Sequence, residues 1–170
     1  MHTEVLQWIA KAKGEYPEHF TGCKVLEVGS RNVNGSPRRY FTDCLYIGID
    51  IMDGKDVDTV CNINDYTVKG FDTVVCCEML EHDAHWQDSL VSMYKALTPG
   101  GLLIITAAGP SRPEHGTKRT TPKDSPGTLS YYRNITQFDL EQFAKRRFDC
   151  NIKYGRDQQD IYFTGTKIGA

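Results

Sequence analysis

Short apolar runs alternate with amphipathic segments along most of the chain. Apolar positions three and four residues apart predict helices over 3–13 and from Asp83 to about Leu97. The run 71–76 is apolar almost throughout, which is typical of a strand buried on both faces. Strands are predicted at 24–28, 45–49, 58–61, 71–76 and 102–106.

The C-terminal third predicts a helix and then a hairpin. Thr136 is followed three residues later by Asp139, which is the spacing of a capping box, so a helix should begin there. Two further strands, 148–154 and 159–167, are separated by a short loop. Alternating strands and helices favour a doubly wound, mostly parallel seven-stranded sheet that ends in an antiparallel hairpin. We expect residues 1–170 to form a single α/β domain.

Composition and charge narrow the function. The chain has 20 Lys and Arg residues against 22 Asp and Glu residues, and its formal net charge is −2. This balance argues against a surface built for nucleic acid or for an anionic membrane. The longest apolar run, 102–108, is far too short to span a bilayer, and the N-terminus has no apolar signal segment. We therefore expect a cytoplasmic protein.

Cysteine and histidine spacings do not predict a metal site. The six cysteines include no C-x-x-C pair, so we expect free thiols. Glu81, His82 and His85 are residue types that bind metals, but their spacing matches no established metal site. The sequence therefore predicts no metal.

The ends of the first two predicted strands indicate a nucleoside cofactor. Gly29 ends the first strand and Asp50 ends the second, and an acid about 20 residues after such a glycine binds ribose hydroxyls. Glu27 lies two residues before the glycine, where its charge would repel the pyrophosphate of NAD or FAD. A cofactor with positive charge beside its ribose suits this carboxylate. S-adenosylmethionine has a sulfonium, an ammonium and a ribose diol, and it has no phosphate.

Four ordered segments carry a family resemblance: VLEVGSRNVNGS, YIGIDI, FDTVVCCEMLEH and ALTPGGLLIITAAGP. Together they resemble the class I S-adenosylmethionine-dependent methyltransferases, particularly the short group often labelled type 11. The resemblance runs in order from about Val25 to Pro110. It implies the Rossmann-like methyltransferase fold and S-adenosyl-L-methionine as the cofactor.

The resemblance also implies roles for individual residues. Glu27 and Gly29 match the family's glycine loop, and Asp50 matches its ribose-binding acid. Ile51 would lie against the adenine, beside Asn62 and the backbone N–H of Ile63. The predicted cofactor residues are Glu27, Gly29, Ser30, Arg31, Asp50, Ile51, Asn62, Ile63, Cys77 and Glu78.

Arg31 departs from the family pattern, because the family usually keeps a glycine there. Its guanidinium either pairs with the cofactor carboxylate or faces solvent. Val33 departs in the same way, and Asn62 is neutral where the family usually has an acid.

Residues 107–134 show neither helical nor strand periodicity. A loop of this length in a compact domain is usually functional or disordered. It carries five basic residues against two acidic ones and follows a strand end. We interpret it as an acceptor-binding lid that suits a polar or anionic acceptor; the alternative is a solvated connector.

His82 and His115 are the candidate catalytic residues, because an imidazole titrates in the range that a general base needs. We expect a methyltransferase acting on a small polar or anionic acceptor, with His82 beside the reacting methyl group. Nucleic acid is a less favoured partner, and the sequence does not indicate the oligomeric state. Three alternatives stay open: a non-catalytic S-adenosylmethionine-binding module, an RNA-directed methyltransferase and, disfavoured by Glu27, a nucleotide-dependent oxidoreductase.

Overall fold

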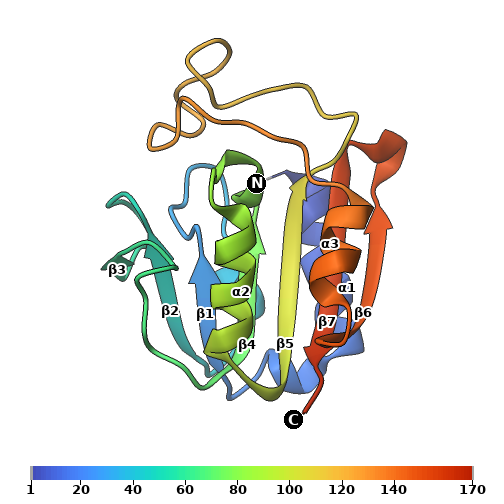
Figure 1. Ribbon diagram of the computed structural model, residues 1–170. Coiled ribbons are helices and arrows are strands. Elements are labelled where there is room, and N and C mark those ends of the chain that lie inside the picture. Colours follow the sequence, from blue (N-terminus) through green and yellow to red (C-terminus); the bar gives the residue numbers. More distant parts are fainter. Residues whose placement is uncertain (1, 170) are drawn as a thin grey trace.

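A computed structural model describes residues 2–169, which build one seven-stranded sheet in the order β3-β2-β1-β4-β5-β7-β6 (Figure 1). β1 to β5 are parallel, whereas β7 runs antiparallel to both β5 and β6. The predicted doubly wound sheet with its C-terminal hairpin is confirmed. The strands are β1 Lys24–Val28, β2 Leu45–Asp50, β3 Thr59–Val60, β4 Phe71–Cys77, β5 Leu97–Ala108, β6 Phe148–Tyr154 and β7 Asp160–Lys167.

Helices cover both faces of the sheet. α1 (Thr3–Glu15) lies on one face, and α2 (Trp86–Ala96) and α3 (Gln137–Ala144) lie on the other (Figure 1). Neighbouring residues of β1 show how a strand serves both layers: Val25 packs in the cluster under α1, and Leu26 packs in the cluster under α2 and α3. Both side chains are fully buried, because successive residues of a strand point to opposite faces.

Several element boundaries differ from the sequence prediction. α1 begins at Thr3 as predicted but ends two residues later than predicted, at Glu15, and its N-cap residue is His2. α2 begins at Trp86 rather than Asp83. The carboxylate of Asp83 instead accepts hydrogen bonds from the His85 N–H at 2.8 Å and the Ser89 hydroxyl at 2.5 Å, both in the first turns.

The connections between β1 and β4 contain very little helix. Only a 3-10 turn, Pro37–Tyr40, joins β1 to β2, and its cap residue Ser36 accepts a hydrogen bond from the Arg38 N–H. β3 is reduced to two residues. On the other side, β5 is longer than predicted and begins at Leu97, which pairs with Phe71 across a register shift. These short connections leave the carboxyl ends of β1 and β2 to be covered by another part of the chain.

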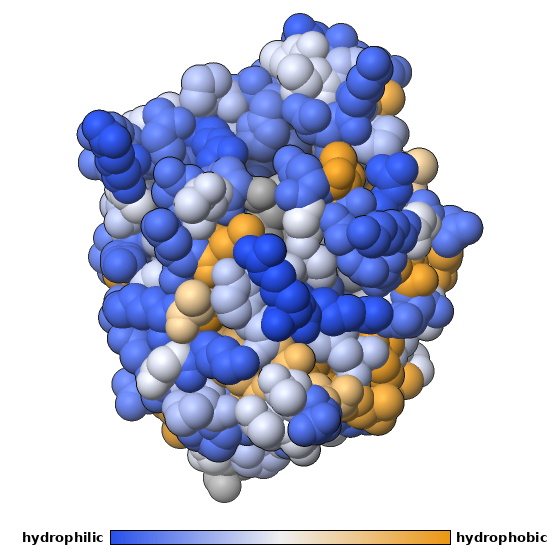
Figure 2. All heavy atoms as spheres, turned by 180° about the vertical axis from the view of Figure 1, so that it is seen from behind, coloured by the Kyte–Doolittle hydropathy of each residue, from blue (hydrophilic) through white to orange (hydrophobic). Residues whose placement is uncertain are grey.

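Residues 107–134 provide that cover. They cross above the carboxyl ends of the strands as a long loop without helix or strand after β5 ends (Figure 1). The opposite view shows a surface of mostly hydrophilic residues, with apolar residues in small groups between them (Figure 2). In residues 2–169, no helix is long and apolar enough to cross a membrane.

Thr136→Ala should destabilise the chain, because the loop returns to the sheet through the cap of α3. The Thr136 hydroxyl accepts a hydrogen bond from the Asp139 N–H, and the Asp139 carboxylate accepts one from the Thr136 N–H at 2.9 Å, which confirms the capping box. Losing such a cap costs about 1 kcal/mol, so Tm should fall by roughly 2–4 °C in a thermal unfolding experiment. Gln142→Ala, an exposed change in the same helix, is the control and should leave Tm unchanged. An unaltered Tm for Thr136→Ala would show that the cap does not hold α3.

Candidate functional site

A cavity of about 610 Å³ lies at the carboxyl ends of β1, β2 and β4, beneath loop 107–134. Its volume falls in the range of small-molecule sites, roughly 300–1,000 Å³. In an open α/β sheet, ligands bind at this edge. The residues predicted from the sequence all line it: Glu27, Gly29, Ser30, Arg31, Asp50, Ile51, Asn62, Ile63, Cys77, Glu78, His82 and His115.

A sharp turn after β1 forms one wall of the cavity. Gly29 has a φ of +78°, and a Cβ at this position would lie 2.9 Å from the side chain of Met79, so the turn requires glycine. The N–H groups of Gly29 and Ser30 both donate to the carbonyl of Ile49. The Ser30 hydroxyl is buried and has no hydrogen-bond partner within residues 2–169, which leaves a polar atom available to a ligand.

Glu27 lies on β1 immediately before this turn and is only 2% exposed. Its carboxylate accepts a hydrogen bond of 2.9 Å from the hydroxyl of Tyr46 on β2. Burial raises the pKa of the Glu27 carboxyl from its ordinary 4.5 to about 8. The carboxyl therefore carries a proton at neutral pH unless a cation binds beside it.

Asp50 ends β2 and stabilises the loop that follows it. One carboxylate oxygen accepts the Met52 N–H at 2.9 Å, and the other accepts the Arg31 N–H at 3.1 Å. Each oxygen keeps further acceptor capacity for a hydroxyl. The Arg31 side chain donates to the Asp53 carbonyl at 3.2 Å, so it supports the same loop from the cavity wall.

The predicted adenine end lies beside Asp50. Ile63 is buried, whereas Ile51 is exposed, and the loop residue Gly127 approaches the Ile51 side chain closely. A Cβ on Gly127 would lie 3.1 Å from Ile51. The Asn62 side-chain oxygen accepts the Asn64 N–H at 2.9 Å and so closes its own turn.

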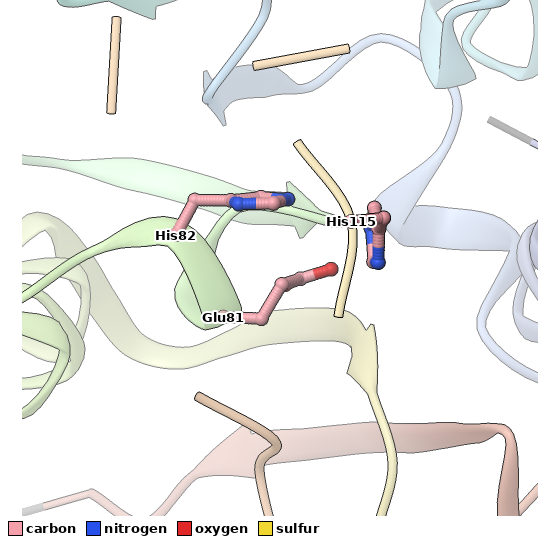
Figure 3. A group of neighbouring side chains, drawn as sticks. All are labelled: Glu81, His82 and His115. Atoms are coloured by element: carbon pink, nitrogen blue, oxygen red, sulfur yellow. The ribbon is translucent and has the colours of Figure 1, made fainter. Parts of the chain in front are cut away.

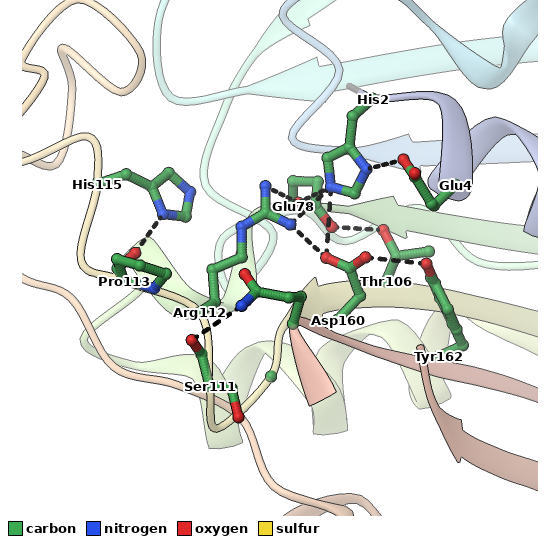
Figure 4. Close-up of polar contacts among 12 residues, drawn as sticks. His2, Glu4, Glu78, Thr106, Ser111, Arg112, Pro113, His115, Asp160 and Tyr162 are labelled. Atoms are coloured by element: carbon green, nitrogen blue, oxygen red, sulfur yellow. Dashed lines mark hydrogen bonds and ion pairs between the residues drawn. The ribbon is translucent and has the colours of Figure 1, made fainter. Parts of the chain in front are cut away.

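The ends of β4, β5 and β7 are tied together by charged groups from distant parts of the chain (Figure 4). Arg112 of the loop pairs with Asp160 at the start of β7 and lies 3.7 Å from Glu78. His2 lies 3.3 Å from each of these two carboxylates, and its hydrogen bonds with Asp160 and then Glu78 raise the pKa of His2 to about 10. The Thr106 hydroxyl donates to Glu78 at 3.0 Å. Arg112 thereby holds loop 107–134 against the sheet.

The candidate catalytic histidines lie together at the other side of the cavity. The His82 and His115 rings are 5.0 Å apart between centroids, and the Tyr132 ring packs edge-on against both. Gly116 makes this approach possible: it has a φ of +67°, and a Cβ there would lie 2.7 Å from the His82 ring. Burial lowers the pKa of His82 to about 4, so His82 is neutral at pH 7.

Basic residues of the loop are less available to an acceptor than their number indicates. Arg112 pairs with Asp160, Arg119 with Glu114 and Arg133 with Asp139. The positive charge from which the sequence predicts an anionic acceptor is therefore largely neutralised within the chain.

Sequence reasoning missed four residues of the site: His2, Arg112 in its bridging role, Tyr132 and Asp160. Asp160 lies 48 residues from Arg112, and His2 lies 110 residues from it. The spacing of apolar residues along the sequence does not predict contacts between residues so far apart. One signal was available for Asp160. It begins a strand that runs antiparallel to β5, so it lies beside the end of β5, where the loop starts.

Comparison with known proteins supports the fold alone. No protein-family model matches the sequence, and the curated proteins give no match. Among solved structures, the chain resembles 1,6-didemethyltoxoflavin-N1-methyltransferase from Burkholderia thailandensis, with bound 1,6-didemethyltoxoflavin and S-adenosylhomocysteine, at 13% identity and a TM-score of 0.68. The match covers 97% of this chain and 79% of that one.

Two further structures agree. Phosphoethanolamine N-methyltransferase 2 from Haemonchus contortus, in complex with S-adenosyl-L-methionine, matches at 16% identity and a TM-score of 0.62, over 97% of this chain and 56% of that one. An S-adenosylmethionine-dependent methyltransferase from Clostridium acetobutylicum matches at 12% identity and a TM-score of 0.63. The match covers 96% of this chain and 92% of that one. The chain therefore has the Rossmann-like fold of the S-adenosylmethionine-dependent methyltransferases, and the resemblance seen in the sequence is confirmed at the level of the fold.

Glu27→Gln should stabilise the free chain increasingly as the pH rises. The pKa of Glu27 is about 8 when folded and near its ordinary 4.5 when unfolded, so only the folded state keeps the proton between these values. The contribution of Glu27 to stability is full below pH 4.5 and is lost as the pH approaches 8. Glutamine does not titrate, so the variant should gain about 2–4 kcal/mol relative to wild type by pH 8 in denaturant unfolding.

Asp149→Asn is the matched control, because it makes the same carboxylate-to-amide change at an exposed position on β6; its effect should not change between pH 5 and pH 8. A stability difference for Glu27→Gln that stays constant from pH 5 to pH 8 would show that Glu27 is already ionised in the free chain.

Proposed function

We propose that the chain is an S-adenosyl-L-methionine-dependent methyltransferase acting on a small polar acceptor. The observation that carries this proposal is the pair of carboxylates at the ends of β1 and β2. Glu27 is buried at the cavity wall with the Tyr46 hydroxyl as its hydrogen-bond partner, and Asp50 stands at the end of the adjacent strand. This arrangement suits a cationic nucleoside and disfavours a pyrophosphate.

The residues present fit S-adenosylmethionine. Asp50 binds the ribose hydroxyls with the acceptor capacity that its backbone contacts leave free. Glu27 meets positive charge, and the unpartnered Ser30 hydroxyl supplies a hydrogen bond near the Gly29 turn. When bound, S-adenosylmethionine supplies a methyl group on a positively charged sulfur. Ile51, Asn62 and Ile63 form the adenine end, and Arg31, Cys77 and Glu78 complete the cofactor wall.

We assign the acceptor to the space beneath loop 107–134. Because His82 is neutral at pH 7, it accepts a hydrogen bond from an acceptor without repelling the cationic cofactor. His115 faces it from the loop. Methyl transfer depends strongly on orientation, which in favourable cases supplies roughly 7–11 kcal/mol, so a loop that fixes the acceptor has a direct catalytic role.

A small acceptor agrees with the similar structures. The Burkholderia protein was solved with 1,6-didemethyltoxoflavin, and the Haemonchus protein is named for phosphoethanolamine. An anionic acceptor is not favoured here, because the loop arginines already pair with carboxylates of the chain.

Asp50→Ala should weaken S-adenosylhomocysteine binding by more than tenfold in isothermal titration calorimetry. The change removes two charge-assisted hydrogen bonds to the ribose, each worth about 1.5–3 kcal/mol. Wild type should bind S-adenosylmethionine more tightly than NAD or ATP. Asp53→Ala is the control, because Asp53 is an exposed aspartate in the same loop that does not line the cavity.

Equal or tighter binding of NAD would contradict the proposed cofactor. An unchanged affinity in Asp50→Ala would show that Asp50 does not bind the ribose. Binding of S-adenosylmethionine without turnover on any acceptor of a broad small-molecule panel would favour the non-catalytic binding module instead.

A further inference from the structure

Glu81 is a buried carboxyl group whose oxygens have no hydrogen-bond partner. It lies in the turn Leu80–His82 after β4, and its side chain is fully buried. Neither oxygen has a hydrogen bond of good geometry within the described chain, although the backbone N–H groups of Glu81 and Ala108 lie near the carboxyl. Its backbone is fixed, because the Glu81 carbonyl accepts the Arg133 N–H at 2.8 Å. Burying a carboxyl without a well-placed hydrogen-bond partner is unfavourable, so this position is a candidate ligand site.

Two imidazoles converge on this carboxyl (Figure 3). The ligand atoms of Glu81, His82 and His115 all lie within 4.8 Å of one another. The Nδ1 atom of His82 is also buried and lacks a partner within residues 2–169. Glu81 and His82 come from the turn after β4, whereas His115 reaches them from loop 107–134 (Figure 3).

The surroundings orient His115 as a ligand. Its Nδ1 lies 3.2 Å from the Pro113 carbonyl, which can only accept, so Nδ1 donates and the lone pair is on Nε2 (Figure 4). Metal-binding histidines are typically fixed in this way by a carbonyl on the second ring nitrogen. Tyr132 packs against both histidine rings and restricts their rotation.

We propose that Glu81, His82 and His115 bind a divalent first-row transition metal ion, with Zn²⁺ or Co²⁺ as suitable probes. Two imidazole nitrogens and one carboxylate are the ligands of catalytic zinc sites and of other open transition-metal sites. Hard ions such as Mg²⁺ and Ca²⁺ prefer oxygen ligands throughout. Ligand atoms around Zn²⁺ lie roughly 3.3 Å apart, given bonds of about 2.0–2.2 Å, so metal binding requires the three side chains to close slightly.

A second cluster, His2, Glu78 and Asp160, also has metal-ligand composition, but it is already neutralised. Arg112 pairs with Asp160 and Glu78 in that cluster and already supplies positive charge to both carboxylates. Glu81 has no ion pair of this kind among the described residues. The metal is therefore assigned to Glu81, His82 and His115 and not to the second cluster.

Three protein ligands leave at least one coordination position open, and His82 and His115 both line the cavity. On the proposed function, this position receives an acceptor oxygen or nitrogen, so the acceptor class is one that coordinates a transition metal through such an atom. With the metal bound, His82 would contact the acceptor through the ion and not by a direct hydrogen bond, and the ion would lower the pKa of a coordinated hydroxyl.

The test is a titration of the full chain, freed of metal by a chelator, with Co²⁺ alone. We expect one equivalent to bind, with visible absorption bands of a four- or five-coordinate site and no thiolate charge-transfer band. His115→Ala and Glu81→Gln should each weaken binding by at least tenfold. His115→Ala changes a loop residue, so it keeps the test informative if Glu81→Gln fails to fold.

Two histidine variants are the matched controls. His85→Ala removes a histidine that lines the same cavity outside the three ligands, and His2→Ala removes the histidine of the second cluster. Both should bind Co²⁺ as wild type does. The proposal is overturned if no stoichiometric Co²⁺ binds, if His115→Ala binds normally, or if His2→Ala alone abolishes binding.

The affinity of His115→Ala for S-adenosylhomocysteine separates this proposal from the proposed function. It should equal that of wild type, because His115 comes from loop 107–134, whereas the proposed cofactor residues lie at the ends of β1 to β4. Loss of Co²⁺ binding with intact cofactor binding supports the metal site. Intact cofactor binding in a chain that binds no Co²⁺ overturns the metal site and leaves the proposed function standing.

Discussion

Four carboxyl side chains lie at the carboxyl edge of the sheet with little access to water, and each must hold a proton or meet a cation. They fall into two pairs. Glu78 and Asp160 are neutralised within the chain by Arg112 and His2. Glu27 and Glu81 are more deeply buried than Glu78, and no ion pair reaches either within residues 2–169. Burial raises the pKa of both carboxyls, so in the free chain they hold protons, and a cation bound beside either one favours its ionised form.

The two pairs of carboxyl groups have different roles around the cavity. The neutralised pair joins loop 107–134 and α1 to the ends of β4 and β7, and so closes the cavity from one side. The other pair belongs to the two proposed ligand sites: Glu27 suits a cationic cofactor, and Glu81 with two imidazoles suits a metal ion. Both proposed ligands are cations, and each would stabilise the ionised form of a carboxyl that holds a proton in the free chain. Groups with such shifted pKa values are concentrated at functional sites.

The sequence was sufficient for the sheet and for bringing the predicted cofactor residues to one cavity. Buried strands have continuous apolar runs, and parallel strands bring their carboxyl ends to one edge, so Glu27 and Asp50 could be placed side by side without coordinates. The loop could not be predicted in the same way. Its path depends on the close approach of Gly116 to His82 and of Gly127 to Ile51. The spacing of apolar residues in the sequence does not predict such contacts.

The cluster of Glu81, His82 and His115, proposed above as a metal site, illustrates the same limit. The sequence shows Glu81 beside His82 and offers His85 three residues later as a third ligand, a spacing that predicts no site. The structure instead brings His115 to the pair from 33 residues away, across a loop without regular structure. Contacts made through long loops depend on tertiary packing, so ligand sets of this kind become visible only in three dimensions.

The central claim is that Glu27 is protonated in the free chain and meets the positive charge of the cofactor. Calorimetric titration of wild type with S-adenosylmethionine at pH 7, in buffers of different ionisation enthalpy, measures the protons released on binding. Because the pKa of Glu27 is about 8 before binding, the account predicts release of close to one proton per cofactor bound, falling toward zero above pH 9. Binding at pH 7 without proton release would contradict it.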